Sequence, residues 1–126
     1  GSTAIARLAT NNIRNLEVSN IEVSKDVFLE WLPQVLTRVQ EDLLVFIDGD
    51  HRGDRLMKYC SMIMETGLSK AVLILDDIHW SADMNRAWRT LINIEEVSLS
   101  LELYNTGILF LGYEIQNDHF IVNFYV

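Results

Sequence analysis

Two short apolar runs constrain the fold of this chain more than any other feature. Leu43–Ile47 reads LLVFI and Ala71–Leu75 reads AVLIL, and no polar residue interrupts either run. Continuous runs of this length are typical of strands that are covered on both faces in a parallel sheet. A polar turn follows each run, and apolar residues at helical spacing come next, over 56–64 and 83–94. This repeated strand–helix pattern predicts an α/β fold.

The segment before the first run predicts two helices and a weak strand. Residues 3–13 carry apolar side chains at helical spacing, and residues 16–23 favour a strand that Asn20 interrupts. Residues 24–40 again favour a helix, and we expect Pro33 in its first turn, where a missing N–H costs least.

The segment after the second helix predicts a group of strands. Residues 97–103, VSLSLEL, alternate with period two, as a strand with one covered face does. Further apolar segments at 107–112 and 119–125 are separated by the turn-rich EIQND. We therefore expect one domain, 1–126, with a mostly parallel sheet that ends in a C-terminal antiparallel hairpin.

Composition excludes several classes of protein. The net charge of -8 argues against a nucleic-acid partner, because neutralising phosphates requires clustered Lys and Arg. No apolar run approaches the roughly 20 residues that span a bilayer, so no membrane partner is expected. The single cysteine, Cys60, excludes an intrachain disulfide and fits a cytoplasmic location; on an apolar helix stripe it is expected in the core.

Acidic residues follow both apolar runs. Asp48 and His51 come after the first run, and Asp76 and Asp77 come after the second. Ligands of open parallel sheets bind outside the carboxyl ends of the strands, and neighbouring strands lie only about 5 Å apart. The three carboxylates would suit a hard cation such as Mg²⁺ or Ca²⁺, while the imidazole of His51 would suit a general base.

A structural explanation competes with this functional one. Aspartates after strands often cap the next helix or close a turn, and Asp77 or Ser81 could serve as such a cap. His79 and Trp80 either line a substrate pocket or pack over the sheet edge. His119 is expected to be structural or exposed.

The residues quoted next resemble a known family. LVFIDGDHRGD, then AVLILDDIHWSADMNRAW, then LYNTGILFLG resemble the C-terminal half of class I S-adenosylmethionine-dependent methyltransferases. The resemblance is closest to the branch of catechol-type, metal-dependent O-methyltransferases. It covers nearly the whole chain and implies a partial Rossmann-like methyltransferase fold that lacks the first strand–helix–strand.

The resemblance also implies roles for the acidic strand ends. Family members hold a divalent metal through an aspartate after one strand and an Asp-Asn pair after the next, positions that fall on Asp48, Asp76 and Asp77. The last is Asp here rather than Asn, which leaves the metal's identity open. The family's lysine base is replaced by His51. The reaction implied is methyl transfer to a small-molecule acceptor, at oxygen.

What the family has and this chain lacks concerns the cofactor. The family binds S-adenosylmethionine at a Gly-rich turn, whereas the six glycines here never form a G-x-G pattern. No cofactor-binding residue is therefore assigned, and the isolated chain is expected to be inactive. The family's strand order, 3-2-1-4-5-7-6, would leave an open sheet edge, so either 16–23 pairs with 43–47 or two copies form a homodimer through that edge.

Two other functions stay open at this point. One is a non-catalytic α/β module that serves assembly or ligand binding, because a fold alone does not determine function. The other is metal-assisted hydrolysis at the acidic strand ends, for which the sequence offers no recognisable set of nucleophile, base and orienting group.

Overall fold

The computed structural model describes residues 2–40, 42–115 and 118–123. The chain divides into two compact units, Gly1–Val35 and Leu36–Val126, each described here by itself. The single domain over 1–126 stays a prediction. Within the described residues, no helix is both long and apolar enough to cross a membrane.

The first unit is helical. It contains α1 (Thr3–Asn15), as the sequence predicts, and nearly all of α2 (Phe28–Leu36). The strand predicted over 16–23 is wrong: these residues have no regular structure, and Glu17 adopts a left-handed φ of 56° that an extended strand does not allow. Pro33 was also misplaced, because α2 already begins at Phe28 and Pro33 lies inside the helix, past its first turn.

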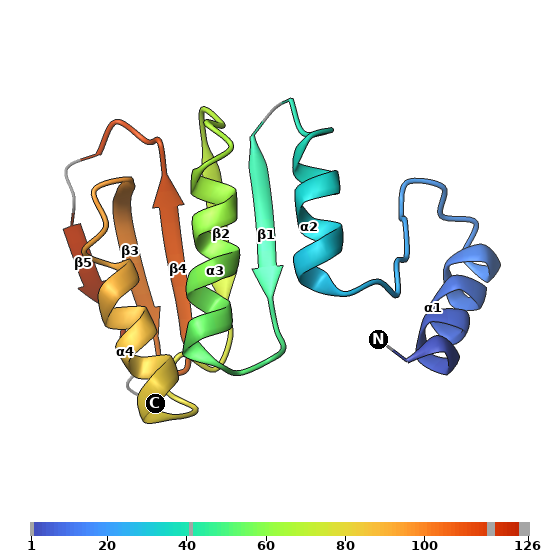
Figure 1. Cartoon of the computed structure of the whole chain (residues 1–126), viewed down its shortest axis with the longest axis horizontal. Helices are drawn as coiled ribbons and strands as arrows, with labels where there is room; N and C mark the ends of the chain where they lie inside the picture. Colours follow the sequence, from blue (N-terminus) through green and yellow to red (C-terminus); the bar gives the residue numbers. More distant parts are fainter. Residues whose placement is uncertain (1, 41, 116–117, 124–126) are drawn as a thin grey trace. The chain divides into compact units, whose positions relative to one another are not determined.

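The second unit is a sheet with helices. Its elements are β1 (Leu43–Ile47), α3 (Gly53–Met64), β2 (Ala71–Leu75), α4 (Ala82–Leu91), β3 (Val97–Leu103), β4 (Thr106–Leu111) and β5 (Asp118–Ile121). The strand order is β1-β2-β4-β3-β5 (Figure 1). Together with the two helices of the first unit, this makes the protein α/β.

The sheet is mixed rather than mostly parallel, which corrects the prediction. β1–β2 and β3–β5 are parallel, whereas β2–β4 and β3–β4 are antiparallel. The reason is the tight turn at Tyr104 and Asn105, which sends β4 back between β2 and β3. The antiparallel hairpin of the described residues is β3–β4; the C-terminal hairpin predicted from 107–112 and 119–125 is wrong, because β5 pairs in parallel with β3 and not with β4. The strand expected over 119–125 is β5, which pairs with β3; residues 124–126, and residues 116–117 of the preceding turn, lie outside the described residues.

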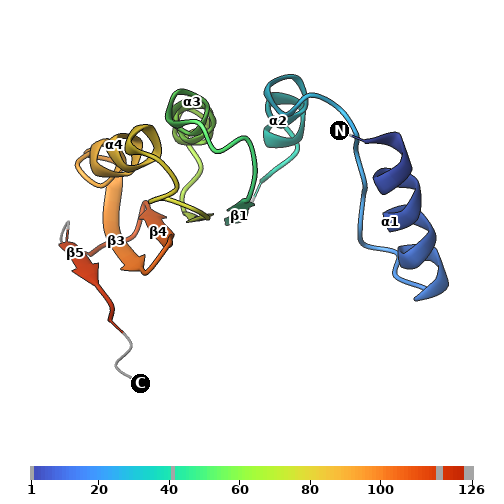
Figure 2. The same ribbon diagram turned by 90° about the horizontal axis from the view of Figure 1, so that it is seen from below.

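Both helices of the second unit cover the same face of the sheet. Figure 2 shows α3 and α4 on one side of the strands. The buried core lies between the helices and this face; it includes Leu56, Ile63, Leu73, Leu75, Trp88, Leu91 and Leu109. The prediction that β1 is covered on both faces is wrong, because Leu44 is 68% exposed and Phe46 is 59% exposed.

Candidate functional site

The two acidic strand ends lie next to each other, as the sequence predicts. β1 and β2 are parallel neighbours, with Ile47 opposite Leu75. The backbone N–H of Asp76 donates to the carbonyl of Ile47 over 3.0 Å, which fixes the two ends side by side. Asp48 is exposed and Asp76 is half-buried, so both acids stand at the rim of the sheet rather than in its core.

Each strand end continues into a turn that contains an aspartate in the left-handed conformation. Asp50 has a φ of 56° and Asp77 a φ of 54°. Asp tolerates this region better than most residues, but the conformation still costs free energy and persists only where neighbours fix it. Asp50 is fixed by the Tyr59 hydroxyl, which donates over 3.1 Å, and lies 3.9 Å from Arg55 Nε. Burial and this hydrogen bond raise the pKa of Tyr59.

Three of the predicted site residues come together across these turns. His51 Nδ1 lies 3.6 Å from Asp77 Oδ2, and the two side chains are 33% and 25% exposed. The ring of His51 lies 5.5 Å from that of Trp80, tilted by 35°. Trp80 is 68% exposed, so its flat indole ring stands in solvent beside the half-buried imidazole of His51, at the carboxyl ends of β1 and β2. This cluster of His51, Asp77 and Trp80 is called the rim cluster below.

The three carboxylates do not fit a ready-made cation site. Asp76 Oδ1 accepts from the Thr106 hydroxyl over 3.3 Å, and Asp77 faces His51. Among the described residues, no group of three or more His, Cys, Asp or Glu side chains is arranged to hold a metal ion. The assignment of Asp48, Asp76 and Asp77 as metal ligands therefore stays a prediction.

The turn after β1 has open space beside its glycine. This glycine is Gly49, and a Cβ placed there would meet no atom within 4 Å. Cys60 confirms the core interpretation: it has no exposed surface, and burial raises the pKa of its thiol to about 12.

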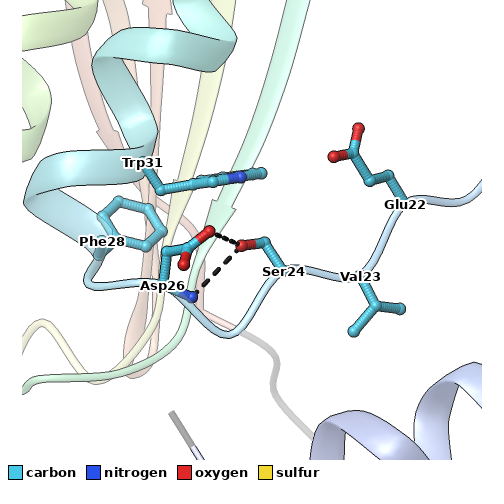
Figure 3. A pocket seen from close by; sticks show the side chains of 6 residues that line it. All are labelled: Glu22, Val23, Ser24, Asp26, Phe28 and Trp31. Carbon is cyan, nitrogen blue, oxygen red and sulfur yellow. Dashed lines mark hydrogen bonds between the residues drawn. The ribbon is translucent and has the colours of Figure 1, made fainter.

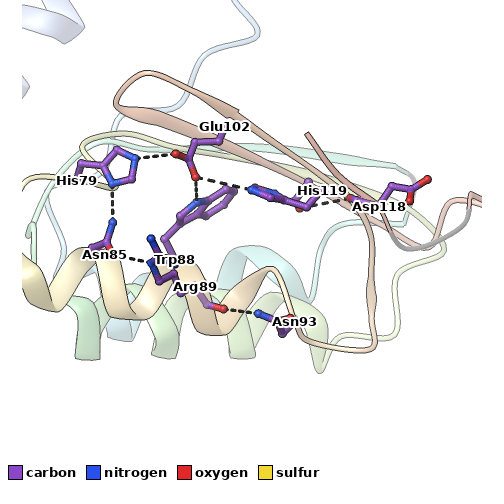
Figure 4. Close-up of polar contacts among 9 residues, drawn as sticks. His79, Asn85, Trp88, Arg89, Asn93, Glu102, Asp118 and His119 are labelled. Carbon is purple, nitrogen blue, oxygen red and sulfur yellow. Dashed lines mark hydrogen bonds and ion pairs between the residues drawn. The ribbon is translucent and has the colours of Figure 1, made fainter. Parts of the chain in front are cut away.

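His79 belongs to a different cluster, which the sequence did not reveal. Its Nε2 lies 3.0 Å from Glu102 Oε1, and the Trp88 indole N–H donates to Glu102 Oε2 over 2.7 Å (Figure 4). His119 Nε2 lies 3.8 Å from the same oxygen. We call these four residues, with Ser100, the Glu102 cluster. The cluster links α4 and β5 to β3. His79 therefore lies close to the rim cluster, but its side chain points toward Glu102 on β3.

The hydrogen-bond directions in this cluster fix the form of His79. Arg89 Nε donates to Asn85 Oδ1 over 3.0 Å, so the Asn85 amide nitrogen is the atom that faces His79 Nδ1, at 2.7 Å. An amide nitrogen can only donate, so His79 Nδ1 accepts and the proton sits on Nε2. His79 therefore donates to Glu102, and the chain of donors runs from Arg89 to the Glu102 carboxylate.

Ser100, His119 and Glu102 follow one another as serine, histidine and acid do in a hydrolytic triad, but a substrate could not reach the serine. The Ser100 hydroxyl lies 2.8 Å from His119 Nδ1, on the opposite side of the ring from Glu102. Ser100, however, has no exposed surface, so no substrate reaches its oxygen. Its hydroxyl satisfies buried polar groups at the β3–β5 junction instead, and hydrolysis gains no support from it. Ser81 has the capping role considered from the sequence, since its hydroxyl accepts from Met84 N over 3.1 Å.

The Glu102 cluster predicts a specific pH dependence of stability. Burial acts to raise the pKa of Glu102, but the hydrogen bonds from Trp88 and His79 outweigh this effect and lower the pKa below its ordinary value of 4.5. Because the folded pKa is the lower one, the contribution of Glu102 is complete above pH 4.5 and is lost as the pH falls through the folded value.

We therefore expect Glu102→Gln to destabilise the chain at pH 7, by a margin that shrinks below pH 4.5. Urea unfolding of both proteins between pH 7 and pH 3 measures this margin, and the exposed Glu96→Gln serves as the control. A margin that stays constant down to pH 3 would contradict the role given to the carboxylate.

Comparisons with protein-family models, with curated proteins and with solved structures found no match. The class that the fold and the site define is thus an α/β protein with a mixed five-stranded sheet and polar clusters at one edge.

Proposed function

We propose that this chain is the C-terminal portion of an S-adenosylmethionine-dependent methyltransferase that methylates a small-molecule acceptor at oxygen. The observation that carries the proposal is the strand order β1-β2-β4-β3, which is the order expected for strands 4-5-7-6 of that family. In this order β4 lies between β2 and β3 and is antiparallel to both. The acidic turns follow β1 and β2, the two parallel strands after which the sequence predicts them.

In this proposal the rim cluster handles the acceptor. His51 takes the proton of the acceptor hydroxyl through Nε2, while Asp77, 3.6 Å from Nδ1, holds the ring in place. Trp80 offers its exposed face to a flat acceptor. The bound cofactor supplies an electrophilic methyl group, and the main task of the protein is to align this group with the acceptor oxygen.

The proposal is tested with the protein translated from the complete reading frame that contains this sequence. We expect transfer of an isotopically labelled methyl group from S-adenosylmethionine to the oxygen of a catechol-type acceptor. His51→Gln should lower kcat/KM by about 100-fold or more, because a general base contributes at least that much. Running the assay with and without Mg²⁺ tests the predicted metal, together with Asp76→Asn.

The matched control is Asp54→Asn, an exposed acid that pairs with Arg52 on the first turn of α3. It should leave kcat/KM unchanged. The proposal fails if the complete protein transfers no methyl group to any hydroxyl acceptor. Calorimetric binding of S-adenosylmethionine at micromolar strength by the 126-residue chain alone would overturn the view that its cofactor site is incomplete.

One observation favours the alternative, a non-catalytic module for assembly. The sheet face opposite α3 and α4 is largely apolar, with Asp118 on β5 and Thr106 on β4 as polar members; the apolar residues that register places on it are Leu44, Phe46, Val72, Ile74, Ile108, Phe110, Leu99, Leu101 and Phe120. β1 is also one of the two edge strands of the described sheet, with β5 at the other edge. Exposed apolar faces and edges of this kind mark association surfaces.

If two copies associate through this face or edge, Phe46→Lys should convert a dimer into a monomer. The reason is that Phe46 is 59% exposed at the edge strand, where a buried charge in the dimer would be strongly unfavourable. Sedimentation velocity measures the mass, and Thr90→Lys on the exposed surface of α4 is the control. A wild-type monomer at all concentrations would exclude the homodimer.

A further inference from the structure

The first unit contains a pocket that the proposed methyl transfer does not use. It has a volume of about 320 Å³ and lies where the irregular segment enters α2; it is lined by Glu22, Val23, Ser24, Asp26, Phe28 and Trp31. This volume falls at the lower end of the range for small-molecule sites. All six residues come from one continuous stretch of the first unit, so the pocket is complete within that unit.

Two aromatic rings form the apolar wall of the pocket. Phe28 and Trp31 lie one helical turn apart on α2, with ring centroids 6.3 Å apart and planes tilted by 49°. Figure 3 shows the Trp31 indole edge-on, with the Asp26 carboxylate and the Ser24 hydroxyl on one side of its plane. The face of an indole carries negative potential, so it attracts a cation more strongly than a neutral group of the same size.

Two carboxylates also line the pocket. Asp26 accepts a hydrogen bond from the Ser24 hydroxyl, and that hydroxyl also accepts from the Asp26 backbone N–H over 3.3 Å. These two bonds hold the carboxylate beside the aromatic wall. Glu22 lines the pocket with a second carboxylate.

The helix dipole opposes a cation here, so the two effects must be compared. The N-terminus of α2, at Phe28, carries the equivalent of about half a positive charge. The Asp26 carboxylate alone carries a full formal negative charge, which is about twice that amount. The pocket is therefore net negative, and it disfavours anions such as phosphate despite its place at a helix N-terminus.

We propose that this pocket binds a small organic cation, a quaternary or substituted ammonium group that the Trp31 and Phe28 rings contact and the Asp26 and Glu22 carboxylates attract. Aromatic rings combined with carboxylates are what such a group requires, because it has a spread charge and an apolar surface. A small hydrated metal ion would contact the rings only through its water shell, and a neutral ligand would lack the charge attraction of the carboxylates. This inference is independent of methyl transfer.

Choline and 3,3-dimethyl-1-butanol provide the test, since they have the same shape and differ in charge. We expect choline to shift the indole N–H signal of Trp31 in heteronuclear NMR spectra, saturating at concentrations on the order of millimolar. The neutral alcohol should produce no saturable shift. The Trp80 and Trp88 indole signals serve as internal references, and Trp31→Phe identifies the Trp31 signal. Sodium chloride keeps the ionic strength constant.

Two variants divide the binding into its parts. Trp31→Leu should weaken choline binding about tenfold through loss of the ring face. Asp26→Asn has the same shape as the wild type and should weaken it roughly fivefold through loss of charge. Asp54→Asn, an exposed acid on α3, should leave binding unchanged. If Trp31→Leu does not fold, Asp26→Asn and the alcohol still decide the question.

Three results would overturn the proposal. The first is the absence of a saturable shift at Trp31 with choline. The second is equal binding of choline and the neutral alcohol, which would reduce the pocket to an apolar surface. The third is displacement of choline by equimolar Ca²⁺ at constant ionic strength, which would make the site one for a bare cation.

Discussion

Replacing Trp88 by alanine is expected to lower the free energy of unfolding by about 4 kcal/mol. Trp88 is 1% exposed, and its indole N–H donates to Glu102 over 2.7 Å. The substitution removes the largest side chain of the buried core and leaves the Glu102 carboxylate without its shortest hydrogen bond. Since whole domains are stable by only about 5–15 kcal/mol, this loss brings the chain close to unfolding.

Urea unfolding followed by far-ultraviolet circular dichroism measures the loss. Trp80→Ala is the matched control, because Trp80 is 68% exposed and its truncation should change stability by less than about 0.5 kcal/mol. Trp88→Phe keeps most of the packing and isolates the hydrogen bond to Glu102. Equal losses for Trp88→Ala and Trp80→Ala would show that the core around α4 is not packed as described.

The same contact explains a glycine in β4. A Cβ at Gly107 would lie 2.6 Å from the Trp88 ring, so Gly107 leaves the space in which the indole reaches Glu102. Gly107→Ala should therefore be far less harmful in a Trp88→Ala background than in the wild type, which a double-mutant cycle measures.

The sequence predicts the parallel pair β1 and β2 because each strand is marked by residues within it and directly after it. β1 and β2 are continuous apolar runs, and their carboxyl ends carry the acids, so the rule for parallel strands places Asp48 next to Asp76 without further information. The same reasoning brings His51 and Asp77 into reach of each other. The directions of the side chains then decide which of these acids meet: Asp77 faces His51, and Asp76 accepts a hydrogen bond from the Thr106 hydroxyl.

β3 shows where local reasoning fails. Its alternation suggests that the leucines face the core, yet Ser100 and Glu102 lie on the helix-covered face and Leu99 and Leu101 on the other. A register shift between Val97 and Leu99 places Val97 on the covered face and then reverses the pattern. A single glutamate within an apolar strand was the signal of the Glu102 cluster, but its partners come from α4, β5 and the loop after β2, which the pattern does not specify.

The second large effect is expected for Gly112→Ala, which should lower the free energy of unfolding by about 3 kcal/mol. Gly112 has a φ of +73°, and a Cβ there would lie 2.0 Å from the backbone carbonyl oxygen of Ser69. Two costs therefore combine: about 1 kcal/mol for an alanine in the left-handed region, and about 2 kcal/mol for the displaced backbone before β2.

Gly67→Ala separates these two costs. Gly67 has nearly the same φ, +67°, but a Cβ there would meet no atom within 4 Å, so only the conformational cost of about 1 kcal/mol should remain. Urea unfolding of both variants gives the difference. Equal losses would mean that the Ser69 backbone moves away at no cost. The start of β2 would then be held less rigidly against β4 than the pairing of Ala71 with Leu111 indicates.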